Sequence, residues 1–242
     1  MEPDELLSTL ATSAATATDA VAAVGLDAPV PTCPAWDLRS LLRHVGTVHS
    51  WVTHLVATAA TAYVPIDAVV SATGGEPPDG DDDLVAWFDG RVQELARVLA
   101  DRGPSAPVWN FADQQPVASF WFRRMAHETA MHAWDAANAA RRARPLDAHL
   151  ASDGIDELLT VMVPRRPPKG LAGSLHVHCT DAQGEWLVDL PSLTTRREHA
   201  RGDVALRGPA SDLLLNLAGR SDGGEVLGDV ALLRAFRDGL RY

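Results

Sequence analysis

The sequence predicts an α+β protein in which an up-and-down four-helix bundle precedes a smaller α+β domain. Apolar residues recur at helical spacing in several long stretches of the N-terminal part. After Gly173 the pattern changes to the alternation that is typical of strands, and a Pro-rich run separates the two patterns. We therefore predict a helical domain over residues 1–163, a linker over 164–172 and a small α+β domain over 173–242.

The composition is that of a globular protein with an excess of acidic groups. The chain has 242 residues, of which 46% are hydrophobic and 22% charged, and its formal net charge is −11. This charge disfavours contact with a phosphate backbone, so we expect no nucleic-acid partner. The N-terminus has no apolar signal region, and no apolar run is long enough to span a membrane. Cys33 and Cys179 make no disulfide framework, and a cytoplasmic location is expected.

The first two helices are predicted from apolar periodicity and from helix breakers. The first helix spans residues 5–24, and prolines force an extended connection after it. The second helix spans residues 38–60. Asp37 is placed to cap this helix, and Trp36 is placed to pack on Leu41 as a hydrophobic staple.

Three histidines lie on the second predicted helix, and they point in different directions. His44 shares a face with the apolar residues of this helix, so we expect it to point inward. His49 lies off that face, and His54 lies about three turns from His44. An inward histidine is commonly a hydrogen-bonded core residue. His44 therefore becomes a candidate metal ligand only if another helix supplies partners.

The segment of residues 65–83 is rich in Pro, Gly and Asp and is predicted to be a loop. The three aspartates at its end are interpreted as the start of a third helix over residues 84–100, where the helix dipole favours negative charge. Residues 108–117 are predicted to be irregular, and a fourth helix follows over 121–136. Helices joined in this way are expected to form an up-and-down bundle with one longer crossover.

The fourth helix carries the strongest chemical signal of the sequence. Glu128 and His132 are four residues apart, and four residues of α-helix turn the backbone by about 400°, so both side chains share one face. A carboxylate and an imidazole placed in this way can hold one metal ion. A zinc site with room for chemistry uses three protein ligands, and His44 is the candidate for the third. The alternative is a solvated Glu–His pair.

The C-terminal part is predicted to contain both helices and strands. We expect a helix over residues 148–162, followed by a hairpin whose strands span 175–180 and 185–190. A further strand over 203–207 and two helices over 208–217 and 229–240 complete this part. His176 and His178 lie on one face of the first strand, a spacing that can bind metal. Because no third ligand is near in the sequence, we interpret them as a solvated strand face.

Three separated motifs resemble those of one known family. The second-helix signature of the mycothiol-dependent maleylpyruvate isomerase family, in the DinB-like metalloprotein superfamily, is similar to CPAWDLRSLLRHVGTVHSW (residues 33–51). The fourth-helix signature is similar to RRMAHETAMHAWD (residues 123–135). The C-terminal domain of the family resembles RGPASDLLLNLAGR (residues 207–220) followed by LGD (residues 227–229). The resemblance implies a DinB-like bundle with a C-terminal α+β domain.

The resemblance also implies a site and a cofactor. His44, Glu128 and His132 match the metal triad of the family, which usually holds zinc, and another divalent metal suits the same ligands. The cofactor of the family is mycothiol, a low-molecular-weight thiol of actinobacteria. The family also uses an arginine of the second domain to hold an anionic substrate. Arg220 is the best match and Arg207 the next; the alternative for Arg220 is capping of a helix C-terminus.

The mechanism implied by the resemblance is addition of a thiolate to a small electrophilic substrate, including an acidic one. Rotation of the adduct and loss of the thiol gives isomerisation, whereas persistence of the adduct gives S-transfer. His49 and His127 are candidates either for proton carriers or for structural residues near the site. Alternatives are a hydrolase that uses metal-bound water, a non-haem iron enzyme, and a non-enzymatic small-ligand binding protein with a structural metal.

Overall fold

The structure, a computed structural model, describes residues 1–73, 75–112 and 114–240. The last two residues of the predicted second domain, 241 and 242, lie outside the described residues. The chain divides into two compact units, Met1–Arg144 and Pro145–Tyr242, and each is described by itself. None of the described helices is both long and apolar enough to cross a bilayer.

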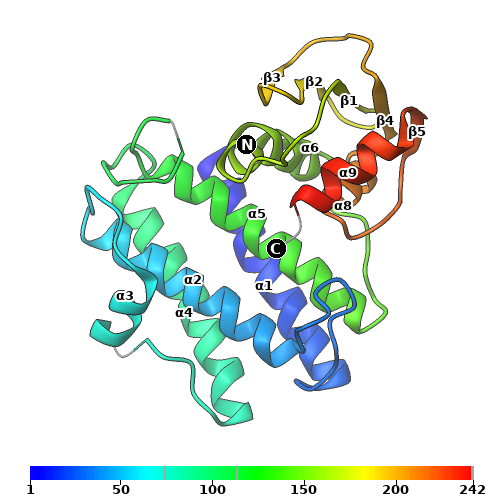
Figure 1. The fold of residues 1–242 in the computed structure, drawn as a ribbon. Helices are drawn as coiled ribbons and strands as arrows, with labels where there is room; N and C mark the ends of the chain where they lie inside the picture. The colour runs from blue at the N-terminus through cyan, green and yellow to red at the C-terminus, as the bar shows by residue number, and fades with distance from the viewer. Residues whose placement is uncertain (74, 113, 241–242) are drawn as a thin grey trace. The chain divides into compact units, whose positions relative to one another are not determined.

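The first unit is helical. Its helices are α1 (Pro3–Val24), α2 (Leu38–Ala57), α3 (Ile66–Thr73), α4 (Asp81–Arg102) and α5 (Ser119–Ala139). Both α1 and α2 pack against α4 and α5, and α3 packs on α2 (Figure 1). Helix α3 lies within the segment predicted to be a loop, which is a correction. Its eight residues are too few for apolar periodicity to become evident.

The contact between α2 and α4 depends on one glycine. A Cβ atom added at Gly46 of α2 would lie 2.3 Å from Cζ3 of Trp87 on α4, so a larger residue would collide with the indole ring. The start of α2 is fixed as the sequence predicts, because Oδ1 of Asp37 accepts a hydrogen bond from the Ser40 backbone N–H at 2.7 Å. These two features set the position of α2 in the unit.

The second unit combines helices with a five-stranded sheet. The helical segments are α6 (Ala148–Glu157), the π-helical turn η1 (Leu158–Met162), α7 (Val163–Arg165), α8 (Ala210–Leu217) and α9 (Val230–Leu240). The strands are β1 (Ser174–Cys179), β2 (Glu185–Asp189), β3 (Thr194–Arg196), β4 (Val204–Gly208) and β5 (Glu225–Gly228). Their order is β3-β2-β1-β4-β5, and β1 is parallel to β4 whereas the other pairs are antiparallel (Figure 1). The predicted α+β class is confirmed.

The division between the units differs from the predicted boundary. Helix α6, which was expected to belong to the helical domain, packs against α8 inside the second unit. The predicted linker, residues 164–172, also lies in this unit, where Pro168 is so close to α9 that a Cβ atom at Gly239 would lie 2.7 Å from it. Apolar periodicity shows that a segment is an amphipathic helix, but it does not show which element covers its apolar face.

Candidate metal centre

The predicted metal triad comes together between α2 and α5. Oε1 of Glu128 lies 3.2 Å from Nε2 of His44 and 3.4 Å from Nε2 of His132. The three candidate ligand atoms all lie within 4.8 Å of one another. Two imidazoles and one carboxylate are a donor set that suits a divalent metal and leaves a coordination position open. The residues present therefore fit the metal that the sequence predicts.

The second oxygen of Glu128 is occupied by Arg124, one helical turn earlier on α5. The guanidinium of Arg124 pairs with Oε2, so Oε1 is the oxygen that faces the two imidazoles. Burial raises the pKa of the Glu128 carboxyl, but the charge of Arg124 and the hydrogen bonds from His132 and His44 outweigh burial and hold this pKa well below its usual value. The carboxyl is therefore ionised, which is the form that binds a metal.

The ring of His132 is oriented by Asp135, which is fully buried. Nδ1 of His132 lies 3.1 Å from Oδ2 of Asp135, and this contact leaves Nε2 directed at Glu128. A carboxylate behind a histidine is the usual support of a metal-binding imidazole. Burial lowers the pKa of His132, but hydrogen bonds to Asp135 and Glu128 outweigh it and raise the pKa to about 9. A metal bound at Nε2 would displace the proton there.

Asp135 also holds the segment that precedes α2. The hydroxyl of Thr32 donates to Oδ1 of Asp135 at 2.6 Å, and Sγ of Cys33 lies 4.0 Å from Oδ2. Cys33, which is remote from the triad in sequence, is therefore separated from His132 by a single carboxylate. The buried carboxylate joins this segment to the metal-binding face of α5.

Trp36 forms an aromatic cover over the triad. The centroid of its ring lies 4.8 Å from that of His44 and 5.7 Å from that of His132. The structure places this indole against the two imidazoles, a contact that the predicted staple with Leu41 does not include. The indole therefore contacts both histidines of the triad.

Comparison with known proteins identifies the family. The family model described as the mycothiol maleylpyruvate isomerase N-terminal domain matches residues 7–137, which is more than half of the chain. The chain belongs to the mycothiol maleylpyruvate isomerase family. The model of the C-terminal domain of this family matches residues 149–235. The family resemblance that the sequence predicts is confirmed.

Two solved structures share the fold. A crystal structure of a histidine-to-alanine mutant of the mycothiol-dependent maleylpyruvate isomerase has a TM-score of 0.65 and 16% identity, with 95% of each chain covered. A second crystal structure of the mycothiol-dependent maleylpyruvate isomerase has a TM-score of 0.56 and 15% identity, again with 95% of each chain covered. No curated protein gives a significant match. At these identities the solved structures establish the fold.

His49 of this family member is a buried, neutral residue that joins α2 to α5. Its Nε2 lies 2.8 Å from Oγ1 of Thr129, and the Thr129 hydroxyl donates to the Met125 carbonyl at 2.7 Å. Nε2 of His49 is therefore the donor in the first contact. Burial lowers the pKa of His49 to about 4. Of the two roles predicted for His49, these contacts favour the structural one; His127 is likewise buried on α5.

Both candidate arginines of the mycothiol maleylpyruvate isomerase family lie in the second unit. Arg220 follows α8, and its Nη1 donates to the Ala218 carbonyl at 2.9 Å, which is the capping interaction that the sequence predicts as an alternative. Arg207 lies on β4 with a half-exposed side chain, and its Nη1 is 3.8 Å from Oε2 of Glu225. The capping contact leaves the family role of Arg220 as a proposal.

Sequence reasoning missed Arg124 and Asp135, which lie beside the triad, and gave Trp36 a different role. Arg124 lies four residues before Glu128, and Asp135 lies three residues after His132, so helical spacing alone places each beside a ligand. That signal was present in the sequence and was not used. Trp36 has no comparable signal, because its position over the imidazoles depends on how the segment before α2 folds back.

Proposed function

We propose that the protein is a metal-dependent enzyme that uses mycothiol as a thiol cofactor or co-substrate and adds the thiolate to a small electrophile. The observation that carries this proposal is the convergence of His44, Glu128 and His132, each of which offers one ligand atom within 4.8 Å of the other two. Membership of the mycothiol maleylpyruvate isomerase family supports the choice of thiol. We propose zinc as the metal, because catalytic zinc sites use two histidines and one carboxylate in this way.

The residues of the chain prepare the site for this chemistry. His44, Glu128 and His132 would hold a zinc ion, whose charge would lower the pKa of a thiol and so supply a thiolate nucleophile at neutral pH. Arg124 fixes the carboxylate of Glu128, and Asp135 fixes the ring of His132. Metal-bound imidazoles are uncharged, so two of them and one carboxylate would leave a divalent ion with a net positive charge, which would favour an anionic thiolate.

Two outcomes of the same addition are proposed. Rotation about the former double bond followed by loss of the thiol gives cis–trans isomerisation of the maleylpyruvate type, whereas an adduct that persists is the product of S-transfer.

An acidic substrate needs a cation, and we propose Arg220 for this role, because its planar fork binds a carboxylate in a bidentate manner. A cytoplasmic location is proposed as well, since a reducing compartment keeps the thiol reduced.

The deciding experiment measures turnover of maleylpyruvate and of simple electrophiles with and without mycothiol. We expect turnover only with the thiol, loss of turnover in His132→Ala, and full activity in a Cys33→Ser/Cys179→Ser double variant. Equal turnover without any thiol would overturn the proposal and favour the hydrolase. Metal analysis that finds iron would favour the non-haem iron enzyme. A chain that binds metal but turns over no thiol–electrophile pair would favour the binding protein.

A further inference from the structure

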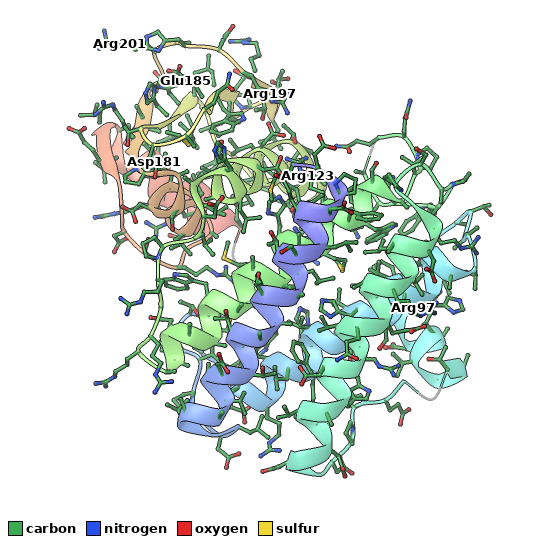
Figure 2. The ribbon with its side chains drawn as sticks, turned by 180° about the vertical axis from the view of Figure 1, so that it is seen from behind. Arg97, Arg123, Asp181, Glu185, Arg197 and Arg201 are labelled. Atoms are coloured by element: carbon green, nitrogen blue, oxygen red, sulfur yellow. The ribbon has the colours of Figure 1, made fainter. Side chains whose placement is uncertain are left out.

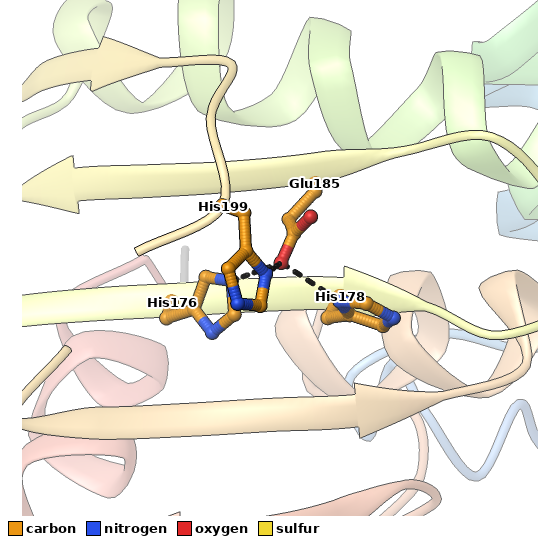
Figure 3. A group of neighbouring side chains, drawn as sticks. All are labelled: His176, His178, Glu185 and His199. Carbon is orange, nitrogen blue, oxygen red and sulfur yellow. Dashed lines mark hydrogen bonds and ion pairs between the residues drawn. The ribbon is translucent and has the colours of Figure 1, made fainter. Parts of the chain in front are cut away.

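A second group of metal-binding side chains lies in the second unit, on residues that the proposed function does not use. His176 and His178 belong to β1, Glu185 to β2, and His199 to the connection between β3 and β4 (Figure 3). Oε1 of Glu185 lies 2.8 Å from Nε2 of His176, 2.8 Å from Nδ1 of His178 and 2.6 Å from Nδ1 of His199. The four side chains converge on one point.

The pleat of the sheet brings three of these side chains together. His178 is the antiparallel partner of Glu185, and His176 lies two residues earlier on the same face of β1. The strand face was predicted to be solvated because no third ligand was near in sequence. The register supplies that ligand from β2, and a distant connection supplies a fourth, so the solvated interpretation does not hold.

The connection that carries His199 lies against β1 because of a glycine. A Cβ atom added at Gly202 would lie 2.9 Å from the backbone nitrogen and 3.1 Å from the Cβ atom of His176. Only glycine lets the main chain pass this close to the strand. The close passage places Gly202 beside the strand, three residues from His199.

The three imidazoles are arranged around a common centre. Their ring centroids are 6.1, 6.0 and 6.4 Å apart, and their planes meet at 69°, 87° and 79°. A single carboxylate oxygen offers about two lone pairs, so three imidazole nitrogens directed at one oxygen exceed what hydrogen bonding to it can satisfy. This spacing and these angles would also allow the three imidazoles to surround one ion.

We propose that His176, His178, Glu185 and His199 form a second metal site, which binds a divalent cation of the zinc class. Imidazole nitrogens and a carboxylate oxygen are suitable ligands for zinc. The ligand atoms lie within 4.8 Å of one another, and rotation of the side chains would bring them to the separation of about 3.4 Å that a tetrahedral zinc site requires.

The number of ligands indicates what the second site does. Four protein ligands complete a tetrahedral shell, whereas catalytic zinc sites keep one position open. The first three ligands belong to paired strands, but His199 lies on the connection and its side chain is 83% exposed. A cation held by all four would therefore fasten residues 197–203 to the sheet. The proposed role is structural and is independent of the chemistry at the first site.

Metal stoichiometry tests the proposal. Full-length protein is stripped with a chelator, titrated with Zn²⁺ and measured for bound metal, and Co²⁺ is used as a spectroscopic probe of tetrahedral coordination. We expect two equivalents in the wild type, one for each of the two groups of candidate ligands among the described residues. A His44→Ala/His132→Ala variant should keep one equivalent, which separates the second site from the first.

His199→Ala is the informative variant, because so exposed a residue can be replaced without disturbing the core. It should bind Zn²⁺ at the second site at least about 10-fold more weakly. The matched control is His149→Ala, which removes another exposed histidine of the same unit and should keep both equivalents. Wild-type affinity in His199→Ala, or complete loss of bound metal in the His44→Ala/His132→Ala variant, would overturn the proposal.

Trypsin provides a readout of the structural role. Arg197 and Arg201 lie on either side of His199 in the sequence, with exposed side chains at the surface of the second unit (Figure 2). Zn²⁺ should slow cleavage after these arginines in the wild type and in His149→Ala, and this protection should be lost in His199→Ala. Cleavage of the wild type at the same rate with and without Zn²⁺ would refute the proposed structural role of the second metal site.

Discussion

Oδ2 of Asp135 lies 3.1 Å from Nδ1 of His132, and this contact fixes which nitrogen of the imidazole faces the metal site. The same carboxylate accepts a hydrogen bond from Thr32 at 2.6 Å. Orientation of a ligand and attachment of the segment before α2 thus depend on one buried group. A conservative substitution of Asp135 should therefore lower metal affinity while the fold is kept.

Asp135→Asn tests this support directly. The amide keeps the size of the side chain but removes the charge behind His132, so we expect metal affinity to fall by about 10- to 100-fold. Affinity is measured by competition with a chelating dye, and circular dichroism checks the fold. Asp101→Asn, on an exposed part of α4, makes the same charge change and should have no effect. Unchanged affinity in Asp135→Asn would contradict the supporting role.

His44→Ala is expected to lose most of the metal at the first site, because two protein ligands do not hold a zinc ion firmly. The measurement is metal content after dialysis against a mild chelator. His54→Ala is the matched control, since His54 is a partly exposed histidine of the same helix and lies outside the triad. Equal metal content in the two variants would refute His44 as a ligand.

His49 should make the protein sensitive to acid. Its folded-state pKa is lowered from 6.5 to about 4, so in this pH range the unfolded chain binds a proton that the folded protein does not. Stability therefore falls as pH falls from about 6.5 towards 4, by up to about 1.4 kcal/mol per pH unit for this one group. The slope of unfolding free energy against pH reports how many more protons the unfolded state binds than the folded state. In His49→Gln this difference should be smaller by about one proton. A slope equal to that of His54→Gln would contradict the assignment.

Gly46→Ala should destabilise the first unit. The added Cβ atom would lie 2.3 Å from the Trp87 ring, and overpacking of this kind costs about 1–3 kcal/mol. Gly90→Ala on α4 is the control, because a Cβ atom there meets no atom of the described residues within 4 Å. That variant should be neutral or more stable by about 0.5–1 kcal/mol. Chemical denaturation of both variants measures the difference, and equal stabilities would show that α2 and α4 can separate at little cost.

Arg220→Lys and Arg220→Ala test the proposed cation of the second unit. Lysine keeps the charge but loses the bidentate fork, so turnover of an acidic substrate should fall in both variants while metal content stays unchanged. Arg207→Ala serves for comparison, since Arg207 is the other candidate. If Arg220→Ala retains full activity and Arg207→Ala does not, the substrate-binding role passes to Arg207. Loss of stability in Arg220→Ala without loss of activity would leave only the capping role.

The sequence predicts most of the first site because helical spacing is local information. Glu128 and His132 are neighbours on any α-helix, and the structure brings His44 within 3.2 Å of Glu128. The second site shows the opposite case. His176 and His178 were recognised as a possible pair, but the approach of Glu185 depends on strand register and that of His199 on a long connection. Neither the strand register nor the path of the connection can be predicted from the periodicity of the sequence.

Element length explains why two of the strands are not predicted. Strands β3 and β5 have three and four residues, which is too short for alternation to be recognised. The long helices were predicted well, since each shows several turns of apolar repeat. The assignment of residues 148–162 to the first domain failed for another reason. A helix that ends before a Pro-rich run looks like the end of a domain, although its apolar face is covered by α8.

The parallel pairing of β1 with β4 has a consequence for the order in which the second unit folds. The antiparallel contacts of β1, β2 and β3 join neighbours in the chain and can form early, as hairpins do. Leu175 must instead meet Val204 across the whole of that meander, so the entropy of closing a long loop opposes the step. We expect β4, through which β5 is attached to the sheet, to pair with β1 only after β1, β2 and β3 have formed, with the connection of residues 197–203 becoming ordered in the rate-limiting event.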